Sequence, residues 1–310
     1  MTAPLIAAAC VAAVVVSAGQ GQRTVFRSGV DLVTFGVTVV DGKGNVVTGL
    51  VPEDFELYED GQRQELEYVL PGDADPASAG PGAALRLGVL FDISGSMQEN
   101  LNLARSAAIK FLGALEEAQD YTLVEFDIEI RVARFGRAEF PRLVERIRNR
   151  KAEGYTALWD ATGVYLDGAS SQEGRKILVL YTDGDDNSSN IRFGELLDLV
   201  KASDVTVHAI GFLEHQSARS RMDSRLRLKQ VAELTGGQAF FPTSLKDLDA
   251  AYERVAAEIA GQYILGYISS NTRPDGTWRK VEIKPRAGLK GVKFRARSGY
   301  FAPLKETGPG

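Results

Sequence analysis

The feature that most constrains this chain is an alternation between two hydrophobic periods over residues 85–262. Short apolar runs, typical of buried strands, alternate with longer segments whose apolar residues recur every three or four positions, as in helices. The apolar runs are Leu85–Phe91, Tyr121–Phe126, Ile177–Tyr181, Val205–Phe212 and Gln238–Phe241. The helical segments are Glu99–Glu117, Phe140–Arg150, Ala157–Ala169, Phe193–Lys201, Arg225–Thr235 and Leu248–Ala260. This order predicts an α/β fold, a Rossmann-like, doubly wound, mostly parallel sheet with helices on both faces.

The segments on either side of that domain have strand character. Residues 30–70 alternate apolar and polar positions, and alternation returns from Tyr263 onward. Residues 71–84 are rich in Pro, Gly, Ala and Ser and predict a linker. Each flank alone is marginal, because a few strands bury too little apolar surface to fold independently. We therefore expect residues 30–70 and 263–302 to form one discontinuous β-sandwich; the alternative is two separate β elements on opposite sides of the α/β core.

Charge is distributed unevenly between these flanks. The stretch Val51–Asp75 has nine acidic residues and one basic residue, whereas the segment from Tyr263 to the end has ten basic and three acidic residues. Opposite charges on paired strands favour pairing, so we expect these two stretches to lie side by side. The net charge of the whole chain is -5 and its pI is about 5.3, and nothing in the composition indicates nucleic-acid binding.

The N-terminus predicts export. Leu5–Ala18 is apolar or small throughout and ends in a small-residue cleavage site, so residues 1–18 are expected to be a signal peptide. The run is too short to span a bilayer, which needs about 20 apolar residues. Its first residues carry no Lys or Arg, and an uncleaved anchor or a misread start are the alternatives. We expect a secreted, periplasmic or cell-envelope bacterial protein with no membrane span after cleavage. Since Cys10 is the only cysteine, the mature chain has no disulfide.

An oxygen-rich loop follows the first apolar run of the α/β domain. Leu87–Phe91 lead directly into Asp92-Ile93-Ser94-Gly95-Ser96. Ligands of open α/β sheets sit at the carboxyl ends of strands, where such loops converge. One carboxylate and two hydroxyls suit a hard cation, best Mg²⁺, which keeps water in its remaining positions.

Two later loops offer further oxygen ligands at the same edge. Asp183 follows the apolar run that ends at Tyr181, and Thr156 lies at a predicted helix start. The Thr156 hydroxyl has a second role open to it, as the N-cap of that helix. Asp183–Asn187 resembles the first positions of a calcium loop, but Ser188 and Gly194 replace the Gly and Glu that such a loop requires. A solvated acidic turn is the simpler interpretation, and a second calcium site is the alternative.

Taken together, Asp92-x-Ser94-x-Ser96, Thr156 and Asp183 resemble the five-residue metal-ion-dependent adhesion site (MIDAS) of von Willebrand factor type A (VWA) domains. All five residue types match in the family's order, and the resemblance covers residues 85–262. Flanking motifs that resemble bacterial secreted members are Gly49-Leu50-x-x-x-Asp54-Phe55 and Arg297-Ser298-Gly299-Tyr300-Phe301. The resemblance implies the VWA fold, and that Asp92, Ser94 and Ser96 bind the ion while Thr156 and Asp183 bind it directly or through water. It also implies that a carboxylate of a partner protein or matrix fills an open position.

We therefore expect a secreted adhesion or protein-binding module, not an enzyme, that holds Mg²⁺ or Mn²⁺ in preference to Ca²⁺. The alternative is a metal-dependent hydrolase or phosphatase using the same Asp cluster, and a third possibility is a scaffold whose site is occupied but unused. A hydrolase needs a general base near the ion. Glu99 and Glu125 are nearest in sequence, but they fall at a helix start and within a strand. Of the two histidines, His208 is predicted to be structural, and His215 lies in a polar loop.

Overall fold

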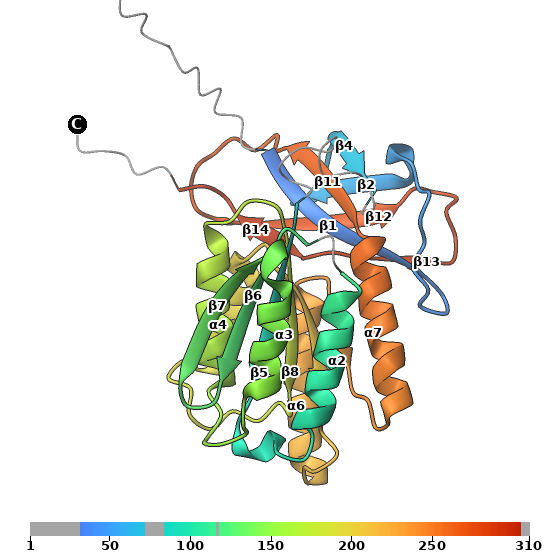
Figure 1. The fold of residues 1–310 in the computed structure, drawn as a ribbon. Helices are drawn as coiled ribbons and strands as arrows, with labels where there is room; N and C mark the ends of the chain where they lie inside the picture. Colours follow the sequence, from blue (N-terminus) through green and yellow to red (C-terminus); the bar gives the residue numbers. More distant parts are fainter. Residues whose placement is uncertain (1–31, 72–83, 116–117, 305–310) are drawn as a thin grey trace, which may run out of the picture. The chain divides into compact units, whose positions relative to one another are not determined.

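The computed structural model describes residues 32–71, 84–115 and 118–304 (Figure 1). The predicted signal peptide and most of the predicted linker lie outside the described residues. The described residues lie in one compact unit, and their strands make three sheets.

The largest sheet has the strand order β10-β9-β8-β5-β6-β7. Its strands are β5 (Leu85–Asp92), β6 (Asp120–Phe126), β7 (Ile130–Gly136), β8 (Arg175–Thr182), β9 (Thr206–Gly211) and β10 (Ala239–Phe240). Neighbours pair in parallel except β6 and β7, which are antiparallel. The central strands β5 and β8 are buried on both faces, which explains their continuous apolar sequences. The predicted doubly wound, mostly parallel sheet is confirmed.

Helices cover both faces of this sheet (Figure 1). One core joins it to α2 (Leu101–Gly113), α3 (Phe140–Asn149) and α7 (Leu245–Ala260). The other joins it to α4 (Leu158–Ser170), α5 (Phe193–Ala202) and α6 (Ala218–Leu234). Successive residues of β5 alternate between the two cores, with Val89 and Phe91 in the first and Leu90 in the second. Among the described residues, no helix has the length and apolar character needed to cross a membrane.

Two elements of this domain differ from the prediction. Strand β7 was not predicted, because it is a half-exposed edge strand that includes two arginines and no continuous apolar run. Helix α6 begins at Ala218, well before the predicted start at Arg225. Ser217 caps it by accepting a hydrogen bond from the Ser220 amide at 3.3 Å. The first turns of α6 are exposed and rich in Arg, so they show no apolar period.

The remaining strands form two four-stranded sheets from both ends of the chain, in the orders β13-β1-β11-β4 and β14-β12-β2-β3. The N-terminal strands are β1 (Leu32–Asp41), β2 (Phe55–Glu59), β3 (Gln62–Gln64) and β4 (Leu66–Leu70), with a 3-10 turn, η1 (Pro52–Asp54). The C-terminal strands are β11 (Tyr263–Ile268), β12 (Trp278–Pro285), β13 (Val292–Arg295) and β14 (Gly299–Phe301). Strand β11 lies between β1 and β4, and β12 pairs with β2. The predicted sandwich built from N- and C-terminal strands is confirmed.

The sandwich is held by apolar packing and by hydrogen bonds from hydroxyl groups. Its core includes Phe35, Val37 and Leu57 from the N-terminal strands and Tyr263 and Leu265 from β11. Lys284 lies opposite Glu56 in the β2–β12 register, but Lys280 and Lys284 both form ion pairs with Glu282 on their own strand. Within the described ranges, no ion pair joins the acidic N-terminal stretch to the basic C-terminal segment. The predicted neighbourhood is correct, and Lys284 interacts electrostatically with Glu56 across the two strands without forming an ion pair with it.

Buried Glu59 joins the N-terminal strands to the C-terminal strands by hydrogen bonds. Its carboxylate accepts hydrogen bonds from the hydroxyls of Tyr267 at 2.8 Å, Tyr300 at 3.0 Å and Ser269 at 2.7 Å. All three donors come from the C-terminal strands or the residue after β11. One N-terminal side chain therefore accepts hydrogen bonds from three residues of the C-terminal part, in addition to the apolar packing between the two parts.

The sandwich meets the amino ends of β8 and β9. A cavity of about 40 Å³ at this seam is lined by residues of both parts, among them Thr34, Phe35, Lys176 and Thr206. The Arg297 guanidinium stacks 4.4 Å from the centroid of the Phe35 ring and donates to the Thr34 carbonyl oxygen at 2.9 Å. The carboxyl ends of the parallel strands lie at the opposite edge of the sheet, away from the sandwich (Figure 1).

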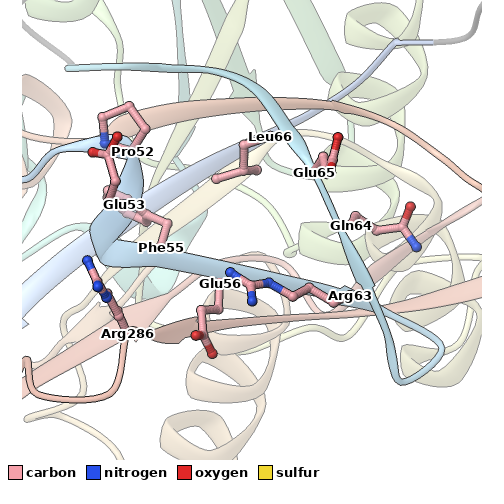
Figure 2. A pocket seen from close by; sticks show the side chains of 9 residues that line it. All are labelled: Pro52, Glu53, Phe55, Glu56, Arg63, Gln64, Glu65, Leu66 and Arg286. Atoms are coloured by element: carbon pink, nitrogen blue, oxygen red, sulfur yellow. The ribbon is translucent and has the colours of Figure 1, made fainter.

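An open hollow of about 980 Å³ lies in the sandwich (Figure 2). Its wall combines the acidic residues Glu53, Glu56 and Glu65 with Arg63 and Arg286, so charges of both signs line it. The hollow lies where the chain leaves β3 to join β4 in the other sheet. Its size reflects this gap at the edge of the sandwich.

Candidate metal centre

Three loops meet at the carboxyl ends of β5, β6 and β8. Asp92 is the last residue of β5 and is fully buried. Its Oδ1 accepts hydrogen bonds from the Ser94 amide at 3.0 Å and from the Ser94 hydroxyl at 2.6 Å. The Ser94 and Ser96 hydroxyl oxygens are 3.1 Å apart, and Ser96 lies in the 3-10 turn η3 (Gly95–Met97). The loop therefore gathers the three predicted oxygen ligands that follow β5 into one cluster.

The second loop is fastened to the first through the backbone. The Gly95 amide donates to the Gly154 carbonyl at 3.0 Å, and the Glu153 amide donates to the Ile93 carbonyl at 2.8 Å. Gly154 has φ 80°, a conformation that favours glycine, and this turns the chain toward Thr156. Thr156 is buried, and its carbonyl oxygen accepts hydrogen bonds from the Asn187 and Ser188 amides at 3.0 Å, which joins the second loop to the third.

Thr156 does not cap helix α4. The N-cap residue is Ala157, with no side-chain capping hydrogen bond. The free amides at the start of α4 are instead satisfied by the third loop, because the Ser189 hydroxyl accepts from Trp159 at 3.1 Å and from Asp160 at 3.0 Å. The Thr156 hydroxyl therefore does not act as the N-cap of α4, the alternative role that the sequence left open.

The third loop carries Asp183, which is buried directly after β8. The residue before it, Thr182, donates a hydrogen bond from its hydroxyl to Asp92 Oδ2 at 2.6 Å and accepts one from the Gly184 amide at 2.9 Å. Thr182 therefore holds the Asp92 carboxylate from the side opposite Ser94. The sequence pattern missed this residue, and its signal was a polar side chain at the last position of an otherwise apolar strand.

The two aspartates repel one another in a buried environment. Burial, and next the negative charge of Asp183, raise the pKa of Asp92 to about 7, although hydrogen bonds from Ser94 and Thr182 oppose the shift. Burial and Asp183 also raise the pKa of Asp185. Among the described residues, neither Asp92 nor Asp183 forms an ion pair with Lys, Arg or His. Two buried carboxylates without a cationic partner, surrounded by hydroxyls, fit the ligand chemistry of a hard divalent cation.

Only two of the five candidate ligands are negatively charged side chains. Within the described part of the chain, no group of three or more His, Cys, Asp or Glu side chains has the arrangement of a metal site. The candidate centre therefore depends on two carboxylates and three hydroxyls, which is typical of a cation that retains water or accepts a ligand from outside.

The candidate general bases are engaged elsewhere. Glu125 is buried on β6 and accepts hydrogen bonds from Arg146 Nε at 2.7 Å and Arg150 Nε at 2.9 Å. Glu99 is largely exposed and lies 3.2 Å from His215 Nδ1. His208 is buried in β9, as predicted for a structural histidine. The large hollow in the sandwich is lined by none of the five candidate ligands.

One known domain family matches the sequence of this chain. The sequence pattern of the von Willebrand factor type A domain matches residues 87–254. No curated protein matches the sequence.

Several solved structures are similar. The PilB minor pilin from Streptococcus sanguinis has 15% identity and a TM-score of 0.46, over 57% of this chain and 61% of the pilin, less than two thirds of its length. The von Willebrand factor type A protein from Catenulispora acidiphila has 13% identity and a TM-score of 0.46, over 91% of this chain and 76% of that one. Proximal thread matrix protein 1 from the mussel byssus, with a zinc-occupied MIDAS motif, has 17% identity and a TM-score of 0.44, over 60% and 47%.

The matched residues 87–254 lie inside the predicted α/β domain and include the oxygen-rich loop at the end of β5, so the resemblance expected from the sequence is confirmed. Because that match spans more than half of the 310 residues, the chain belongs to the von Willebrand factor type A domain family.

Proposed function

We propose that this chain is a cation-dependent protein-binding module whose centre consists of Asp92, Ser94, Ser96, Thr156 and Asp183. The observation that carries the proposal is the pair of buried carboxylates, Asp92 and Asp183, of which Asp92 accepts hydrogen bonds from the Ser94 and Thr182 hydroxyls. Within the part of the chain that the structure describes, neither carboxylate has a basic partner. Leaving two such charges uncompensated is costly, and a cation offsets that cost. Membership of the VWA family, whose domains mediate protein interactions, supports the same function.

The chain's own residues prepare the centre. Ser94 and Thr182 hold the two oxygens of Asp92 in place, so the carboxylate needs little rearrangement to act as a ligand. The hydrogen bond from the Gly95 amide to the Gly154 carbonyl joins the loop that carries Thr156 to the first loop, which supports Thr156 as a ligand. When bound, Mg²⁺ or Mn²⁺ would supply the positive charge that lets a carboxylate from another protein approach two aspartates.

The rim of the centre fits a protein partner. The side chain of Tyr155, beside Thr156, is 66% exposed. Exposed aromatic side chains next to a specific polar anchor are typical binding hot spots. We therefore propose that the partner presents an Asp or Glu to the centre and an apolar contact to Tyr155. We also propose that the mature chain is secreted or held in the cell envelope, beginning close to Gly19.

The test is capture of partners from extracellular and envelope fractions with the mature chain, in Mg²⁺ and in EDTA. We expect proteins that are retained in Mg²⁺, released by EDTA, and absent from capture with Asp92→Ala. Asp167→Ala is the matched control, because Asp167 is an exposed aspartate on α4. Capture that is equal with and without EDTA would contradict the proposal. Hydrolysis of p-nitrophenyl phosphate by the wild type, lost in Asp92→Ala, would instead indicate the hydrolase.

A further inference from the structure

The outer face of α6 is an exposed surface with mixed apolar and basic character. Met222 is 64% exposed and Leu226 is 54% exposed, one helical turn apart. Arg219 and Lys229 extend the same row at either end, because residues three or four apart share a helix face. We call these four residues the α6 face. An exposed row of this kind is common at surfaces that bind another protein.

Charge on this helix is opposite to that of the chain. Residues 218–234 contain Arg219, Arg221, Arg225, Arg227 and Lys229 against two acidic residues, whereas the net charge of the whole chain is -5. Helix α3 differs, because its Arg142 and Arg146 are ion-paired with glutamates. On α6 itself, Arg221 pairs with Glu214 and Lys229 with Glu233, each at 3.9 Å. Among the described residues, Arg219, Arg225 and Arg227 form no ion pair, and these three positive charges favour an acidic partner.

Two arginines of α6 are held in place by aromatic rings of neighbouring segments. The Arg225 guanidinium lies 4.3 Å from the centroid of the Phe241 ring, and that of Arg227 lies 5.5 Å from the centroid of Phe193. A guanidinium stacked on a ring keeps its N–H groups available for carboxylates. Since stacking restricts these side chains before a partner arrives, less conformational freedom is lost on binding.

Helix α6 also packs against the loop that carries Asp183, one of the candidate ligands. Gly184, next to Asp183, packs closely against Ser224 on the inner side of α6. A Cβ atom added at Gly184 would lie only 2.9 Å from the Ser224 Cβ, which is too close for two carbon atoms. Just before the helix, the Gln216 side-chain amide donates to the Asp183 carbonyl at 2.8 Å and to the Asp185 carboxylate at 2.7 Å. The α6 face thus lies on the reverse side of a helix that supports a ligand loop.

We propose that the α6 face is a second contact for the protein partner, and that it takes an acidic segment bearing apolar side chains. The inference rests on the proposed function, because the same partner places a carboxylate in the metal centre. The basic residues attract the segment and set its orientation, and Met222 and Leu226 contribute the apolar contact.

The test uses a displayed library of random 16-residue peptides, selected on the mature chain in Mg²⁺. We expect the selected peptides to be enriched in Asp and Glu together with Leu, Phe or Trp. The best peptide should bind Met222→Ser/Leu226→Ser about tenfold more weakly, whereas Val164→Ser/Leu199→Ser should bind it like the wild type. Val164 and Leu199 are the matched control, because they are exposed apolar residues on α4 and α5. Unchanged Mg²⁺ binding by the α6 variant shows that the fold is intact.

The outcomes separate the two proposals. Peptides that bind equally in EDTA but lose affinity in the α6 variant support the α6 face and contradict the cation centre as a binding site. Loss of affinity in EDTA with none in the α6 variant overturns the α6 inference alone. A selection that yields no peptides enriched in acidic and apolar residues also overturns it.

Discussion

At the scale of residues, the candidate centre depends on how Asp92 is held. Its two oxygens are engaged from opposite sides by Ser94 and Thr182, and the charge of Asp183 is nearby. The sequence predicted the five candidate ligands because each follows a strand or begins a helix at one edge of the sheet. It could not predict Thr182 as a support or Ser189 as a cap of α4, because both contacts join loops distant in the chain.

Thr182→Val tests this support. The change keeps the shape of the side chain and removes both hydrogen bonds made by the hydroxyl. Loss of such a supporting group typically weakens metal binding about 10–100-fold. We expect Thr182→Val to bind Mg²⁺ about 10–100-fold more weakly than the wild type, measured by calorimetry. Thr122→Val on β6 is the control, because Thr122 is also a buried strand threonine. If both variants keep wild-type affinity, Thr182 does not position the ligand.

At the scale of elements, continuous apolar runs predicted the buried strands well, because a central parallel strand is covered on both faces. The same criterion failed for β7, an edge strand, and for the exposed first turns of α6. In the sandwich, alternation predicted strands in both flanks, whereas the contacts of Glu59 depend on side chains that are more than 200 residues away.

Glu59→Ala should destabilise the sandwich. The substitution leaves the hydroxyls of Tyr267, Tyr300 and Ser269 without their shared acceptor, and hydrogen bonds to a buried charge are among the stronger ones. We expect a loss of about 2–4 kcal/mol in the free energy of unfolding, measured with urea. Glu67→Ala, at an exposed position on β4, should have no measurable effect. Equal stability of the two variants would contradict the role assigned to Glu59.

His208 makes stability depend on pH. Burial, and next the charge of Arg295, lower the pKa of His208 to about 3. Glu258 lies 3.7 Å from His208 Nδ1, too far for a hydrogen bond, and its carboxylate is 2.6 Å from Arg295 Nη2. Because the folded pKa is depressed, stability is fully present above the unfolded pKa of about 6.5 and is lost as the pH falls toward 3.

The magnitude follows from the same linkage. Between pH 7.5 and pH 4.5, His208 should account for a loss of about 2–3 kcal/mol in the free energy of unfolding. The measurement is urea unfolding of the wild type and His208→Gln at both pH values. We expect the variant to lose correspondingly less stability over this interval. Parallel pH profiles would show that His208 does not remain neutral in the folded state.

At the scale of the whole molecule, the sandwich joins the two ends of the chain around the α/β domain. Strand β11 lies between β1 and β4, so the N-terminal strands depend on the C-terminal segment for hydrogen bonds. We propose that residues 30–70 and 263–302 form one folding unit, with the 85–262 domain inserted as a second.

Deletion of residues 262–310 tests that proposal. We expect residues 30–70 to become sensitive to limited proteolysis, because β1, β2 and β4 lose their C-terminal partners. The 85–262 domain should stay protected, since its cores are formed almost entirely by its own strands and helices. Continued protection of residues 30–70 in the truncated chain would mean that they fold without the C-terminal strands.

The most direct test of the account is a calorimetric titration of the mature, EDTA-treated chain with Mg²⁺ and, in parallel, with Mn²⁺. The account predicts one bound ion per chain, no binding by Asp92→Ala, and wild-type binding by Asp167→Ala. Ser94→Ala should bind more weakly without losing the site, because one neutral ligand is removed and not a charge. Absence of binding by the wild type, or equal binding by Asp92→Ala, would contradict the central claim that these residues form a cation site.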